Sequence, residues 1–244
     1  MIIQQVRNAT LVLNYAGMKF VTDPWLSLKG DNIFGPTVEL PISIEEIVSN
    51  TDAFILTHKH PDHFSEYGLP KDKPIFVQNV KDEKALKKLG FTHIQILSEE
   101  DTRFGDIILF KTKGVHIKPK LFPFSVLIGE VCGVVFKHPT EKTVYFAGDT
   151  VWCSDVKNAI DLYHPDIIIV TACAAKLPVG RLIMNQEDVY RVYQVASDST
   201  IIISHMESVS HATVTRNDMR NFLQQKGICS NIHIPNDGDV LSLD

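Results

Sequence analysis

The chain has 244 residues, of which 44% are hydrophobic, and a formal net charge of -5 at pH 7. This length accommodates one large domain or two small ones, with enough apolar residues for a sizeable core. The acidic balance does not indicate a nucleic-acid-binding surface, and no apolar run reaches the roughly eighteen residues of a membrane-spanning helix. The N-terminal residues lack the pattern of a signal peptide, and the four cysteines form no C-x-x-C pair. A reducing, cytoplasmic location is therefore expected.

Short β-rich segments dominate the first part of the chain. A hairpin is predicted at Ala16-Gly17. A capping-box pattern at Ser43-Ile44-Glu45-Glu46 predicts a short helix that ends at Val48, and an amphipathic helix is predicted from Lys81 to Leu89. The predicted strands of this part span residues 1–7, 10–15, 18–22, 53–56, 74–77, 94–97 and 107–112.

Helices and strands alternate in the second part of the chain. Residues 117–129 interrupt the pattern with two prolines and are predicted to form a loop over the site. After them, strands are predicted at 131–137, 143–147, 167–171, 200–204, 231–234 and 239–243, and helices at 155–163, 185–196 and 215–226. No linker or repeat divides the chain, so residues 1–244 are predicted to form a single domain. Its expected architecture is α+β, with two mixed sheets packed together and helices outside.

A metal site is predicted directly after the apolar segment 53–56. Three imidazoles and one carboxylate follow within six residues, namely His58, His60, Asp62 and His63. Neutral imidazole and carboxylate are ligands that divalent transition metals accept readily. The alternative is a polar turn that happens to be rich in histidine.

Three further candidate ligands follow other predicted strands. His116 comes after strand 107–112, Asp149 after strand 143–147 and His205 after strand 200–204. Strand ends on one edge of a layered α/β structure share a crevice in which ligands collect. The seven side chains are therefore expected to converge, although about 150 residues separate the first from the last.

The order T-H-x-H-x-D-H, His, G-D-T and a final His resembles that of the metallo-β-lactamase superfamily. Thr22-Asp23-Pro24 and Ser204-His205-Met206-Glu207 are similar to its ascorbate-6-phosphate lactonase-like branch. The resemblance implies a hydrolase with a four-layer αββα sandwich and a site along one edge of the two sheets. It also implies that His58, His60 and His116 hold one metal, that Asp62, His63 and His205 hold a second, and that Asp149 bridges both. Where relatives would carry a glycine after the third-motif histidine, this chain has Ile117.

Two divalent ions, zinc with manganese or iron as alternatives, are expected to share a water molecule and convert it to hydroxide at neutral pH. Asp62 is a candidate catalytic residue that orients this nucleophile or passes its proton to the leaving group. His211 is a second candidate, as a substrate contact or proton donor; the alternative is a surface loop. Asp23 either accepts an N–H from a ligand imidazole or merely forms a turn. Cys153 and Cys173 are expected to be small buried residues, since no base that would stabilise a thiolate is identifiable.

The predicted function is hydrolysis of a small-molecule lactone, ester or phosphoester. One alternative is a metal-dependent phosphodiesterase or nuclease, and another is a non-catalytic metal-binding or ligand-sensing protein. No nucleic-acid or membrane partner is expected, and a homo-oligomer is compatible with the sequence. Four cations on loops near the predicted site either attract an anionic substrate or are ordinary solvated charges: Lys118, Lys120, Lys176 and Arg181.

Overall fold

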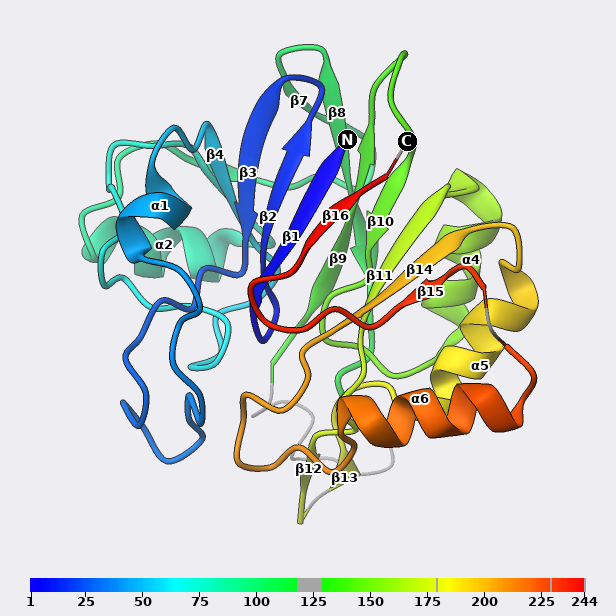
Figure 1. The fold of residues 1–244 in the computed structure, drawn as a ribbon. Helices are drawn as coiled ribbons and strands as arrows, with labels where there is room; N and C mark the ends of the chain where they lie inside the picture. The colour runs from blue at the N-terminus through cyan, green and yellow to red at the C-terminus, as the bar shows by residue number, and fades with distance from the viewer. Residues whose placement is uncertain (118–128, 179, 229, 244) are drawn as a thin grey trace.

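The computed structural model describes residues 1–117, 129–178, 180–228 and 230–243. Two seven-stranded sheets lie face to face, with helices on both outer sides (Figure 1). This arrangement confirms the predicted αββα sandwich. None of the helices in the described ranges has the length and apolar character needed to cross a membrane.

The first sheet has the strand order β16-β1-β2-β3-β4-β5-β6. Its strands are β1 (Ile2–Arg7), β2 (Thr10–Tyr15), β3 (Met18–Thr22), β4 (Ala53–Leu56), β5 (Ile75–Val77), β6 (Ile94–Ile96) and β16 (Val240–Ser242). Helices α1 (Ile44–Val48) and α2 (Val80–Lys88) cover its outer face. Side chains of Ser43 and Asn79 cap the N-termini of these helices, because a side-chain oxygen there satisfies an otherwise unpaired backbone N–H.

The second sheet has the order β15-β14-β11-β10-β9-β8-β7. Its strands are β7 (Thr102–Phe104), β8 (Ile107–Lys113), β9 (Cys132–Lys137), β10 (Val144–Phe146), β11 (Ile167–Thr171), β14 (Thr200–Ser204) and β15 (Ile232–His233). Helices α4 (Ser154–Tyr163), α5 (Gln186–Val195) and α6 (Arg216–Gln225) pack on its outer face. A small hairpin of β12 (Lys176–Leu177) and β13 (Gly180–Arg181) projects beyond the sheet edge (Figure 1).

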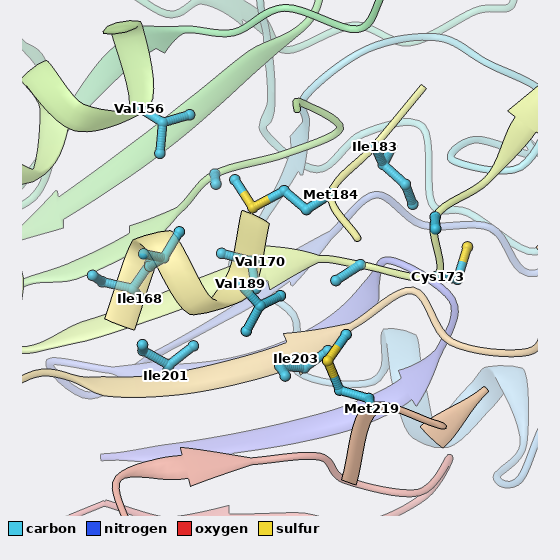
Figure 2. Close-up of a cluster of buried hydrophobic side chains, with 14 of the residues drawn as sticks. Val156, Ile168, Val170, Cys173, Ile183, Met184, Val189, Ile201, Ile203 and Met219 are labelled. Atoms are coloured by element: carbon cyan, nitrogen blue, oxygen red, sulfur yellow. The ribbon is translucent and has the colours of Figure 1, made fainter. Parts of the chain in front are cut away.

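Successive residues of the central strands point to opposite faces of the sheet and pack in two different apolar layers. Ile202 points between the two sheets, whereas Ile201 and Ile203 point toward the helices. Figure 2 shows this outer layer, where Val189 of α5 and Met219 of α6 lie against the strands. A strand buried on both faces reads as a continuous apolar run, which is why these segments were predictable.

Strand direction brings the predicted site to one edge of both sheets. Strands β3, β4, β5 and β6 are parallel, and β1 points the same way because it is antiparallel to β2, which is antiparallel to β3. In the second sheet β10, β11 and β14 are parallel, and β8 shares their direction through β9. The carboxyl ends of all these strands lie at the lower edge in Figure 1, away from the two chain ends.

The sequence did not indicate β7 or the hairpin of β12 and β13, whose strands have two or three residues. Their sequences, Thr-Arg-Phe, Lys-Leu and Gly-Arg, lack the apolar run that indicates the equally short β5 and β10. The loop predicted at 117–129 falls outside the described residues, apart from Ile117 and Gly129.

Candidate metal centre

The first group of converging side chains comprises His58, His60 and His116. One nitrogen from each lies within 4.8 Å of the others. His58 and His60 follow β4 in the first sheet, whereas His116 follows β8 in the second. The ring centroids of His60 and His116 are 5.0 Å apart, so the two sheets meet here with their imidazoles facing one another.

The second group comprises Asp62, His63 and His205, whose ligand atoms also lie within 4.8 Å of one another. His205 Nε2 is 3.2 Å from His63 Nε2 and 3.3 Å from Asp62 Oδ2. His205 follows β14 of the second sheet. Each group therefore takes ligands from both sheets.

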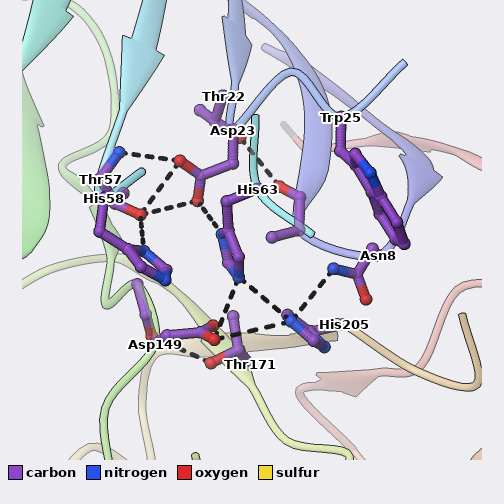
Figure 3. Close-up of polar contacts among 12 residues, drawn as sticks. Asn8, Thr22, Asp23, Trp25, Thr57, His58, His63, Asp149, Thr171 and His205 are labelled. Carbon is purple, nitrogen blue, oxygen red and sulfur yellow. Dashed lines mark hydrogen bonds and ion pairs between the residues drawn. The ribbon is translucent and has the colours of Figure 1, made fainter. Parts of the chain in front are cut away.

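Asp149, which follows β10, lies between the two groups. Its Oδ2 is 3.0 Å from His63 Nε2 and 3.6 Å from His205 Nε2. Its Oδ1 is buried and has no hydrogen-bond partner among the described residues. The ring of His58 lies 4.0 Å from that of His63, centroid to centroid, so the two groups are adjacent (Figure 3). This placement suits the bridging role predicted for Asp149.

Four of the histidines have a partner at Nδ1, which directs Nε2 toward the centre. His63 donates from Nδ1 to Asp23 Oδ2 at 2.9 Å, and His116 donates to the Asp149 carbonyl at 3.1 Å. For the other two, the partners of Nδ1 are Thr57 Oγ1 (His58, 3.1 Å) and Cys173 Sγ (His205, 3.5 Å). Because Thr57 Oγ1 already donates to Asp23, it accepts from His58. Such partners fix the tautomer and orientation of a metal ligand.

Asp23 accepts an N–H from His63, one of the candidate ligand imidazoles. It is fully buried and also accepts hydrogen bonds from the backbone N–H and hydroxyl of Thr57. Asp23, His58 and His63 also lie close enough to form a third potential ligand group. Since the Asp23 oxygens already accept hydrogen bonds from His63 and Thr57, we assign Asp23 to support of the two histidines and not to metal binding.

Burial and charge shift the pKa values of the histidines in the two groups in opposite directions. Burial lowers the pKa of His116 to about 4 and lowers that of His58 well below its ordinary value. Burial also opposes the charged form of His63, but Asp149, Asp23 and Asp62 outweigh it and raise the pKa of His63 to about 10. His58 and His116 of the first group are thus neutral at pH 7, and the carboxylates around His63 favour its charged form.

The residues present fit divalent metal ions. His58 Nε2, like Asp149 Oδ1, is a buried atom without a hydrogen-bond partner in the described part of the chain. Buried polar atoms are normally satisfied, and a metal ion would satisfy both of these. The neighbouring carboxylates stabilise the proton on His63. A metal ion could replace that proton, since metal binding releases protons from its ligands.

A pocket of about 220 Å³ opens onto both groups. One side of the pocket is lined by side chains of the two candidate ligand groups, among them His60 and Asp62, and by Asp149 between the groups. Its walls are mostly apolar and comprise Phe34, Pro61, Ala175, Leu177 and Leu182. The hairpin of β12 and β13 contributes Leu177, so this small element shapes the pocket.

His211 lines the same pocket. This position agrees with the interpretation that it contacts substrate, and not with that of a surface loop. Its ring meets that of Phe34 edge-on at 5.5 Å between centroids. Burial lowers the pKa of His211, and its Nδ1 is buried without a hydrogen-bond partner among the described residues.

The lysine and arginine side chains expected near the site do not line this pocket, as far as they belong to the described residues. Arg181 Nη1 is paired with Asp188 of α5 and with the Ile183 carbonyl, and Lys176 is exposed. Lys118 and Lys120 lie outside the described residues. Lysines do line the neighbouring cavities that reach His58, His60 and His116, namely Lys59, Lys81, Lys111 and Lys113.

Sequence reasoning missed the role of two residues. Cys173 is buried, as expected, but its contact with His205 was not foreseen, although it follows β11 at the same edge. Asn8 follows β1 and was not considered at all. The signal that could have found both is the same one that identified the ligands, a polar residue just after a strand that ends at this edge.

Known proteins share both the sequence and the fold. The family described as a beta-lactamase superfamily domain matches residues 18–206. The UPF0173 protein YddR of Bacillus subtilis (strain 168) is 44% identical over 251 residues, which cover 97% of this chain and 98% of YddR. Among solved structures, the isothiocyanate hydrolase from Delia radicum gut bacteria has a TM-score of 0.93 and 38% identity, covering 99% of both chains. A possible metal-dependent hydrolase from Veillonella parvula DSM 2008 has a TM-score of 0.96 and 33% identity, covering 100% of this chain and 99% of that one.

Fold, candidate ligands and relatives together define a metal-dependent hydrolase with the metallo-β-lactamase fold. The chain belongs to the beta-lactamase superfamily and, within it, to the UPF0173 family. The superfamily prediction is thus confirmed. The ascorbate-6-phosphate lactonase-like branch stays a prediction.

Proposed function

We propose that the protein hydrolyses a small, uncharged molecule with an electrophilic carbon, using two divalent ions. The first ion would be held by His58, His60 and His116, and the second by Asp62, His63 and His205, with Asp149 between them. Ions held there would lower the pKa of a bound water molecule to about 7 and polarise the bond under attack. Zinc is the expected metal, with manganese and iron as alternatives for a site of nitrogen and oxygen ligands.

The observation that carries this proposal is the apolar pocket over both ligand groups. Its walls can bury a small apolar substituent, while the reacting carbon faces the candidate ligands. Among the described residues, no lysine or arginine lines it, which disfavours the phosphoesters in the initial prediction. Lactones and esters remain candidates.

Isothiocyanates join the candidates because a relative with 38% identity over nearly the whole chain is an isothiocyanate hydrolase. Addition of water to R–N=C=S gives a thiocarbamic acid, which releases the amine R–NH2 and carbonyl sulfide. The central carbon is uncharged and electrophilic, and the R group is free to be apolar. This class therefore fits the same pocket.

Two residues of this chain are assigned to proton movement. Asp62 lines the pocket, where its carboxylate can orient the attacking water and take up its proton. His211, whose lowered pKa keeps it neutral at pH 7, lies in the same pocket, where it can accept that proton from Asp62 and pass it to the leaving atom.

The test is a substrate panel with metal-reconstituted protein. We expect turnover of an aryl or alkyl isothiocyanate, a lactone or a carboxylic ester, little with a phosphodiester, and loss of at least about 100-fold in Asp62→Asn. Turnover of the phosphodiester alone would support the nuclease alternative. Absence of turnover by the metal-loaded protein across the panel would support the non-catalytic alternative. Unchanged turnover in Asp62→Asn would reject the role of Asp62.

A further inference from the structure

The second ligand group is assembled from two sheets and needs a connection between them. Asp62 and His63 follow β4 of the first sheet, whereas His205 follows β14 of the second. A metal site tolerates errors of only a few tenths of an ångström in ligand distance. Packing of apolar side chains between the sheets does not by itself fix polar groups at their edge that closely.

Asn8 holds the backbone of His205 through its own carbonyl. This residue lies in the turn between β1 and β2, is fully buried and has a left-handed φ of 54°. Its carbonyl accepts hydrogen bonds from the His205 N–H at 3.0 Å and from the Ser204 hydroxyl at 2.8 Å. A third bond comes from Gln5 Nε2 at 2.9 Å. A turn of the first sheet thereby fixes the end of β14 in the second.

The Asn8 side chain reaches both ligands. Its Nδ2 donates to the Asp62 carbonyl at 2.9 Å. The same nitrogen lies 3.1 Å from His205 Nε2 (Figure 3). The Asp62 carbonyl can only accept, so the amide nitrogen must face it. An ion at His205 Nε2 would take the lone pair there, leaving the contacts with the Asp62 carbonyl and the His205 backbone to act in the loaded protein.

We propose that Asn8 is a positioning residue that sets the separation of Asp62 and His205 and so determines the affinity of the second metal position. The inference rests on the proposed two-metal function. It assigns to Asn8 no contact with substrate and no proton transfer. The first position, whose ligands are His58, His60 and His116, does not depend on it.

The left-handed backbone of Asn8 allows the side chain to be tested separately from the turn. Glycine adopts positive φ without strain, so Asn8→Gly removes the carboxamide and retains the backbone carbonyl in place. Asn50 offers a matched control, because it is also left-handed, at φ 56°, but exposed after α1. Asn50→Gly makes the same chemical change without touching either ligand group.

The experiment is a titration of the metal-free full-length chain with Co²⁺, followed by absorption spectra and by equilibrium dialysis with metal analysis. We expect two ions per chain in the wild type and in Asn50→Gly. In Asn8→Gly we expect an unchanged first ion and a second bound about 10- to 100-fold more weakly, the range for loss of a group that supports a ligand. The visible bands of the second ion should change in the same variant.

Two results would overturn the inference in distinguishable ways. Two ions bound by Asn8→Gly with wild-type affinity and spectrum would reject the role of Asn8 and leave the proposed function intact. One ion bound by the wild type would reject the two-metal function itself, and the inference with it. Near-ultraviolet circular dichroism of Asn8→Gly checks that the fold is retained; equal weakening of both ions would show a general disturbance and also reject the role.

Discussion

Asp23 shows at the scale of one residue how a buried carboxylate supports a ligand without binding metal in the proposed arrangement. Burial raises its pKa, which means that its charge is costly in this position. Hydrogen bonds from His63 and Thr57 offset that cost. In return, the carboxylate fixes the His63 tautomer and, through the Thr57 hydroxyl, orients His58.

Asp23→Asn should weaken metal binding and lower turnover by about 10- to 100-fold. The substitution preserves the shape of the side chain but removes the charge that retains the proton on His63 Nδ1. Equilibrium dialysis with metal analysis measures the first effect and steady-state kinetics the second. Asp52→Asn is the control, because Asp52 is an exposed residue just before β4 that accepts from the Lys19 N–H. Wild-type affinity in Asp23→Asn would refute this role.

At the scale of elements, the end of β10 depends on a glycine. Gly148 has φ 66°, and a Cβ at this position would lie 2.2 Å from the Cys132 carbonyl oxygen of β9. No side chain can enter that gap without moving the backbone. The close approach of the two strands fixes where Asp149, the next residue, leaves the sheet.

Gly148→Ala should therefore displace Asp149 as well as destabilise the fold. We expect a loss of at least about 2 kcal/mol in the free energy of unfolding, a fall of roughly 4–8 °C in Tm, and a loss of activity in the protein that remains folded. Gly17→Ala is the matched control, since Gly17 has φ 76° and nothing within 4 Å of an added Cβ. Thermal unfolding followed by circular dichroism compares the two; equal effects would show that strain alone, and not the close contact, matters.

Strand directions also explain which site residues could be predicted. His116, Asp149 and His205 each follow an apolar strand, and the parallel or doubly antiparallel pairing of those strands places their ends together. Asn8 follows β1 by the same logic, but a single asparagine in a turn is chemically unremarkable. Its role depends on the second sheet, because the end of β14 lies opposite Asn8 and places Ser204 and His205 in contact with it.

At the scale of the whole molecule, the metal centre joins the two sheets, so removing metal should loosen the sandwich. Each ion present at 1,000 times its Kd would add about 4 kcal/mol to the free energy of unfolding, or roughly 8–16 °C in Tm per ion for a chain of this size. Chelation followed by thermal unfolding measures this difference. A Tm unaffected by chelation and by metal addition would contradict the proposed sites.

The difference between the two forms should increase with pH. In the metal-free chain the pKa of His63 is raised to about 10, so its stabilising contribution is complete below its ordinary value near 6.5 and is lost as pH rises through about 10. In the loaded chain His63 is neutral and this loss is absent. Melting curves of chelated and loaded protein from pH 6.5 to 9.5 measure the widening.

The sequence by itself determined the layers of the fold and the chemical identity of the centre. Apolar runs marked the buried strands, and His58, His60, Asp62 and His63 are so close in sequence that local spacing alone indicates metal binding. The tertiary structure decided how these residues are held and what the pocket accepts. Asn8, Cys173 and Asp23 act through hydrogen bonds to residues distant in the chain. Phe34, Leu177 and Leu182 line one pocket only because the loop after β3 meets the hairpin of β12 and β13. Such contacts depend on strand pairing and sheet packing, which local pattern does not encode.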